Sequence, residues 1–196
     1  MSLSADEDHQ HALVRLTRYI REAAEILARW DAYSDEHSDA EGWPHDPSAY
    51  GYRQRRRDAD TWEAFAKIRF VALTHLLPFA ERQLTNIPTL RVRPRWSWQL
   101  KTLRTSLDEL YCLQEHWLAE RDALPDRAVP GTEEYDEPLA DRNAEAWHHL
   151  DTWAVHGQAL LDINTAAQQQ PRRRTSPPTA TVISAARTKP ASRRTP

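Results

Sequence analysis

The sequence has little of several residue types on which common functional sites depend. One cysteine, Cys112, among 196 residues excludes an internal disulfide and any zinc site that needs two thiolates. Only four glycines are present, and they form neither a glycine-rich phosphate loop nor the turn that exposes a catalytic serine. We therefore expect no metal and no cofactor.

Long apolar runs are also missing. No uninterrupted apolar stretch approaches the roughly 18 residues that a membrane span needs. The N-terminal residues MSLSADEDHQ are acidic, unlike a secretory signal. The sequence predicts a soluble, cytoplasmic protein without a membrane partner. Eight tryptophans favour a packed core, because each can remove roughly 200 Å² of surface from water.

Charge is distributed unevenly along the chain. All 29 acidic residues precede Pro171, so residues 1–170 carry 19 basic side chains and a net charge of −10. The remaining 26 residues carry seven basic side chains, five prolines and no acid. Such a segment cannot offset its ordering entropy by burial. We expect a helical domain over residues 1–170 and a disordered Arg/Pro-rich tail over residues 171–196.

Apolar residues before the tail recur at helical spacing between proline-bearing connections. A first helix is expected from Ser4 as N-cap, and a second from Asp46 and Pro47, with a break near Leu76 caused by Pro78. A third is expected after Pro94 with Ser97 as N-cap, and a fourth from about Asp136 to Leu160. We find no β-strand pattern and no internal repeat. The expected fold is all-α, an antiparallel four-helix bundle.

Four arginines lie within YGYRQRRRDAD, at Arg53, Arg55, Arg56 and Arg57. On a helix, Arg55 would meet Asp58 and Arg56 would meet Asp60. We interpret this cluster as a solvated, internally paired helix face, and a phosphate-binding site as the weaker alternative.

A second group of basic residues is predicted at the opposite end of the bundle. The loop LRVRPRW and the start of the tail would meet there, with two tryptophans available for stacking. The expected partner is nucleic acid or an acidic protein, and an Arg-rich extension without a partner is the alternative. The candidate binding residues are Arg91, Arg93, Arg95, Trp96, Trp98, Arg172, Arg173 and Arg174.

The stretch RNAEAWHH carries the one candidate catalytic motif. An arginine, an asparagine and a nearby histidine in the last helix resemble the signature of HEPN-type ribonucleases. The resemblance covers about eight residues and implies a dimeric, metal-independent ribonuclease using Arg142, Asn143 and His148 or His149. The alternative is a polar boundary beside the core. Glu145 and His148 also match half of a di-iron pattern, but the sequence contains no second Glu-x-x-His.

Because no complete catalytic set is evident, we expect a non-enzymatic interaction or accessory protein. The HEPN-like ribonuclease is the alternative, and a homodimer is compatible with either. An acidic domain that inhibits a basic enzyme is a third option.

Overall fold

A computed structural model of the chain describes residues 5–169, and side chains from residue 7 onward. This part of the chain is all-α, as the sequence predicts, and contains no β-strand beyond an isolated bridge between Ser38 and Pro44. The four longest helices are α1 (Ala5–His37), α2 (Pro47–Ala66), α5 (Arg95–Ala123) and α6 (Glu133–His156). The expected Ser4 cap and the tail from residue 171 lie outside the described residues.

The helix starts follow local chemistry. The Asp46 side chain accepts hydrogen bonds from the amides of Ser48 and Ala49, which confirms the predicted cap of α2. The predicted cap at Ser97 is wrong, because α5 already begins at Arg95. A proline directly before the helix supplies the fixed φ that its first turn needs. Helix α6 begins three residues before Asp136, and its first turn is acidic, which favours a helix N-terminus.

The predicted second and fourth helices are each divided. Helix α2 ends at Ala66 and is followed by the short α3 (Arg69–Val71), a π-helical turn η1 (Ala72–Leu76) and α4 (Leu77–Asn86). The α-helix is first interrupted at residues 67–68, about ten residues before the predicted break. A second change, from the π-helical turn to α4, falls at Leu76 and Leu77, where Pro78 predicts it, and the wide π turn absorbs the missing amide of Pro78. The expected fourth helix divides at Gly157, after which α7 (Gln158–Gln168) continues.

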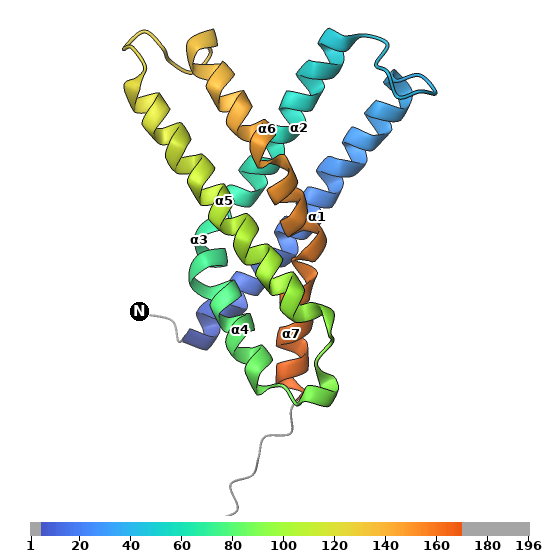
Figure 1. The fold of residues 1–196 in the computed structure, drawn as a ribbon, viewed down its shortest axis with the longest axis vertical. Helices are drawn as coiled ribbons and strands as arrows, with labels where there is room; N and C mark the ends of the chain where they lie inside the picture. The colour runs from blue at the N-terminus through green and yellow to red at the C-terminus, as the bar shows by residue number, and fades with distance from the viewer. Residues whose placement is uncertain (1–4, 170–196) are drawn as a thin grey trace, which may run out of the picture.

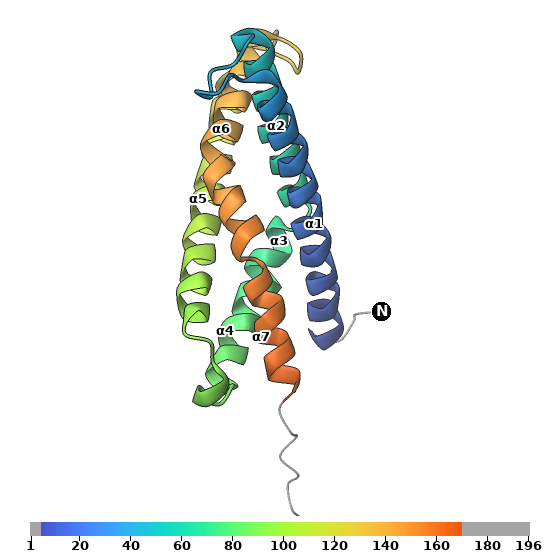
Figure 2. The same cartoon turned by 90° about the vertical axis from the view of Figure 1, so that its right-hand side faces the viewer.

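The helices form two antiparallel hairpins that cross, α1–α2 and α5–α6 (Figure 1). The hairpins diverge toward their tips, whereas α4 and α7 lie together in the other half of the molecule (Figures 1 and 2). The loop between α4 and α5, which includes the 3₁₀ turn η2 (Thr89–Arg91), and the end of α7 lie at the base. The fully buried side chains belong to one hydrophobic core to which both hairpins contribute, including Leu16, Tyr19, Phe65, Leu103, Leu107, Leu150 and Trp153.

The two hairpins repeat one pattern, which corrects our expectation of no internal repeat. Buried residues of α1 recur in α5 at a constant offset of 87: Leu13, Leu16 and Ala23 correspond to Leu100, Leu103 and Leu110. Helices α2 and α6 share an offset of 85, so RDADTW at 57–62 corresponds to RNAEAW at 142–147.

Aromatic contacts follow the same correspondence. Trp30 of α1 meets Tyr50 of α2 edge-to-face at 4.9 Å between ring centroids, and Trp117 of α5 meets Tyr135 of α6 in the same way at 5.3 Å. The hairpins thus have equivalent interiors, and differences between their surfaces are not imposed by the fold.

Candidate functional site

The predicted basic loop lies against the end of α7. The Arg91 guanidinium donates to the side-chain oxygen of Gln169 at 3.0 Å. Arg93 pairs with Asp162 of α7 at 3.0 Å, and Arg95 is exposed at the start of α5. The loop therefore adjoins the last described residue of the chain. Arg172, Arg173 and Arg174 lie beyond the described residues.

The two tryptophans of this loop have different environments. Trp98 is 57% exposed and contacts the ring of His156 edge-on at 5.0 Å between ring centroids. Trp96 is only 2% exposed, because it lies among the core residues. Its predicted role in stacking on a ligand is wrong, whereas Trp98 keeps an accessible ring.

Arg142 of the HEPN-like motif is held within its own chain. Its guanidinium lies 3.9 Å from the ring centroid of Trp62, donates to Gln114 at 2.7 Å and also donates to the Asn143 side chain. Burial, followed by the nearby charge of Arg69, lowers the pKa of Arg142 to about 10. Arg142 is therefore still protonated at neutral pH, and it joins α6 to α2 and α5.

The two histidines of the motif lie next to each other. The ring centroids of His148 and His149 are 3.6 Å apart. His148 is exposed and His149 is half-buried. Burial and the neighbouring His148 lower the pKa of His149, against the charge of Glu109. At neutral pH, His149 is thus favoured in its uncharged form.

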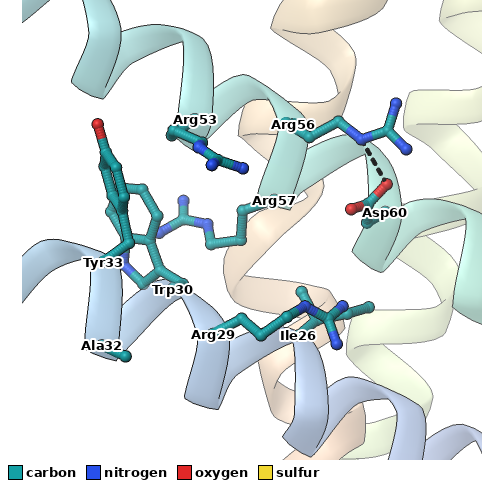
Figure 3. Close-up of a pocket in the computed structure, with 9 residues that line it drawn as sticks. All are labelled: Ile26, Arg29, Trp30, Ala32, Tyr33, Arg53, Arg56, Arg57 and Asp60. Carbon is teal, nitrogen blue, oxygen red and sulfur yellow. Dashed lines mark ion pairs between the residues drawn. The ribbon is translucent and has the colours of Figure 1, made fainter.

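The structure contains a further basic site, formed by residues that we interpreted from the sequence as a solvated helix face. We call it the α1–α2 arginine pocket; it has a volume of about 330 Å³ and opens on the α1–α2 hairpin (Figure 3). Its charged and aromatic lining consists of Arg29, Trp30, Tyr33, Arg53, Arg56, Arg57 and Asp60.

One wall of this pocket is a fixed arginine. The Arg57 guanidinium lies between two indole rings, 4.5 Å from the centroid of Trp30 and 3.7 Å from that of Trp147. It also donates twice to Asp58, whose side chain is 2% exposed. Burial raises the pKa of the Asp58 carboxyl, against the opposing hydrogen bond and charge of Arg57. Arg57 therefore compensates a buried carboxylate.

The predicted pairing of the cluster is correct in one of two cases. Arg56 pairs with Asp60 at 3.0 Å, one helical turn away, as expected. Asp58 pairs with Arg57 and not with Arg55, because Asp58 faces the interior while Arg55 is exposed. The prediction that this cluster and the basic loop lie at opposite ends of the molecule is confirmed (Figure 1).

Arg57 and Arg142 are equivalent residues in the two hairpins, and each stacks on a tryptophan of the other hairpin. The sequence signal for this arrangement was the pair RDADTW and RNAEAW. Comparing the two segments would have shown that Arg142 is a structural counterpart of Arg57, which the HEPN resemblance alone did not reveal.

No protein-family model, curated protein or solved structure matches the chain. Within residues 5–169, no cluster of three or more histidine, cysteine or acidic side chains could share a metal ion. The same part of the chain has no helix both long and apolar enough to cross a membrane.

Proposed function

We propose that the protein is a non-enzymatic interaction protein that binds an anionic partner, nucleic acid or an acidic protein. The binding surface is the basic loop with Arg91, Arg93 and Arg95, the exposed Trp98, and the tail that begins with Arg172, Arg173 and Arg174. The supporting observation is the contact between Arg91 and Gln169, because Gln169 is the last described residue and precedes the start of the tail, Pro171, by two positions in the sequence.

The charge distribution favours binding of an anion by the loop and the tail over binding by the rest of the domain. The domain up to residue 170 carries −10 and the tail carries +7, so a polyanion is repelled by most of the domain. Arg95 is exposed, and no ion pair engages it within residues 5–169. Trp98 nearby offers a ring on which a base can stack.

Binding to single-stranded RNA across a range of salt concentrations tests the proposal. Full-length protein is compared with a variant in which the seven basic tail residues are replaced by glutamine. If all seven contact phosphates, the slope of log affinity against log salt should decrease in magnitude by about 5, since each contributes about 0.7 for a single strand. Equal affinity and slope for the two proteins would contradict nucleic-acid binding by the tail.

Two controls separate the remaining possibilities. Arg55→Gln removes an exposed arginine at the opposite end and should leave the affinity unchanged. A polyglutamate peptide is the second probe: stronger binding to the peptide than to RNA would identify the partner as an acidic protein.

No observation favours the ribonuclease alternative, because the Arg142 guanidinium is engaged by Gln114, Asn143 and Trp62 of the same chain. That alternative requires Arg142→Ala to abolish cleavage of RNA and requires a dimer in solution.

A further inference from the structure

We propose that the α1–α2 arginine pocket is a second anion site, which binds a small ligand with two or more linked phosphate groups. The pocket lies between α1 and α2, in the half of the molecule that contains the hairpin tips (Figures 1 and 3). The basic loop lies at the base, in the other half. The pocket is therefore separate from the surface of the basic loop.

The lining of the pocket has an excess of positive charge. Four arginines and one acid, Asp60, line it. Asp60 is paired with Arg56, and the buried Asp58 neutralises Arg57. Arg29 and Arg53 have no carboxylate partner among residues 5–169, so two positive charges remain for a ligand.

Three of the arginines that line the pocket are exposed to solvent. The side chains of Arg29 from α1 and Arg53 from α2 lie on either side of Arg57, whereas that of Arg56 points toward Asp60 (Figure 3). All three are exposed, so their guanidinium groups can turn toward a ligand without breaking core contacts. Arginine forks suit phosphate oxygens, because they donate two parallel hydrogen bonds with charge assistance.

The aromatic residues argue against a stacked base as the main contact. The Tyr33 ring lies under Arg53 at 5.3 Å and stacks on His37 at 4.0 Å between ring centroids. The Arg57 guanidinium lies over the Trp30 ring, and the Trp30 and Tyr50 rings meet edge-to-face. Since residues of the same chain already contact both rings, we expect guanidinium groups to be the main contacts of a ligand.

The size of the pocket favours more than one phosphate. A volume of about 330 Å³ is at the lower limit for small-molecule sites and exceeds what a single phosphate ion fills. Two uncompensated arginines on different helices also match two linked anionic groups better than one.

The second hairpin serves as an internal comparison. At the positions equivalent to Arg29, Arg53 and Arg56 it has His116, Pro138 and Asp141. Its interior contacts, by contrast, are kept: Arg142 stacks on a tryptophan, and Trp117 meets Tyr135. The fold thus does not require arginines at these three surface positions, which supports a binding role for them.

Calorimetric titration of the full-length protein with inorganic pyrophosphate tests this proposal. The variant Arg29→Gln with Arg53→Gln should weaken binding at least tenfold, because each charge-assisted hydrogen bond to phosphate contributes a factor of about ten or more. Arg55→Gln is the matched control on the same helix as Arg53 and should stay within twofold. Circular dichroism confirms that the variants keep their helical content.

Titrations with adenosine diphosphate and with adenosine show whether the ligand is a nucleotide. If adenosine diphosphate and pyrophosphate bind with similar affinity, the ligand is a free molecule with linked phosphates. If adenosine diphosphate binds at least tenfold more tightly than pyrophosphate, the ligand is a nucleotide. The proposal is overturned if pyrophosphate does not bind, if the double variant binds it equally well, or if adenosine binds as tightly as the diphosphate.

Discussion

Removing the Arg57 side chain should destabilise the protein more at neutral pH than at acid pH. In Arg57→Ala, the Asp58 carboxylate stays buried at 2% exposure but loses the guanidinium that donates to it at 2.9 and 2.6 Å. Breaking a buried ion pair in this way costs about 3–5 kcal/mol. We expect a value near the lower limit, about 3 kcal/mol, because Arg57 is 11% exposed and water can replace it in part.

The pH dependence follows from the direction of the Asp58 pKa. Burial already raises this pKa above its unfolded value, and Arg57 opposes the rise, so the variant must have a still higher folded pKa. Below the unfolded pKa of about 4, Asp58 is protonated in every state and the loss of its partner costs little. The stability difference between wild type and variant should therefore grow as the pH rises from about 4 to 7.

The assays are urea unfolding and thermal unfolding, both followed by circular dichroism at pH 4 and pH 7. A loss of about 3 kcal/mol corresponds to a decrease of about 6–12 °C in melting temperature for a domain of this size. Adding Asp58→Asn to Arg57→Ala should recover much of the loss and remove the pH dependence, because a neutral amide costs less to bury.

The second hairpin supplies a control with the same geometry and a neutral partner. In Arg142→Ala, the group that loses its partner is the neutral amide of Asn143 and not a carboxylate. We therefore expect a loss of unfolding free energy of about 1–3 kcal/mol that is similar at both pH values. Arg55→Ala removes an exposed side chain and should stay within about 0.5 kcal/mol. The reasoning is refuted if Arg57→Ala costs no more than Arg55→Ala, or if the loss is equal at pH 4 and pH 7.

Two further substitutions test the core. Tyr19→Phe removes a buried hydrogen bond of 2.9 Å to the carbonyl of Leu150 and should cost about 1 kcal/mol at pH 7. Burial, followed by Asp151, raises the pKa of Tyr19, so wild type loses stability above pH 10 as the unfolded tyrosine ionises. Urea unfolding at pH 7 and 10.5 should show a smaller decrease for Tyr19→Phe, and an equal decrease would contradict this. Gly157→Ala puts a Cβ 2.6 Å from the carbonyl oxygen of Trp153 and should cost about 1–3 kcal/mol, whereas no loss in melting temperature would show that the α6–α7 junction relaxes freely.

The sequence was sufficient to predict the helical class and many of the core residues. Leu13, Leu16, Leu103, Leu107 and Leu150 recur at helical spacing, and all are buried. The same spacing also predicted Tyr52, Phe70 and Leu73 on the inner face of the second helix, which is wrong, because all three are exposed. The cap at Asp46 was also predictable, because a side-chain acceptor directly before proline is a local signal.

The divisions at residues 67–68 and at Gly157 were not predictable in the same way. Apolar spacing continues across both, and the breaks depend on how α4 and α7 pack in the other half of the molecule. Local periodicity does not contain that tertiary information.

For the candidate sites, the sequence identified the charges but not their partners. Spacing predicted the pair of Arg56 and Asp60, since both lie on one helix. The stacks of Arg57 on Trp147 and of Arg142 on Trp62 join residues about 80 or more positions apart, so the internal repeat was the one sequence signal for them.

The central claim is that the molecule has two separate anion-binding surfaces at opposite ends. Arginine side-chain NMR of the full-length protein tests it most directly, by following the Nε–Hε signals during titration with a single-stranded RNA and then with pyrophosphate. We expect RNA to shift the signals of Arg93 and Arg95, and pyrophosphate to shift those of Arg29, Arg53 and Arg56. If neither ligand shifts its set, or if both shift the same set, the claim is contradicted.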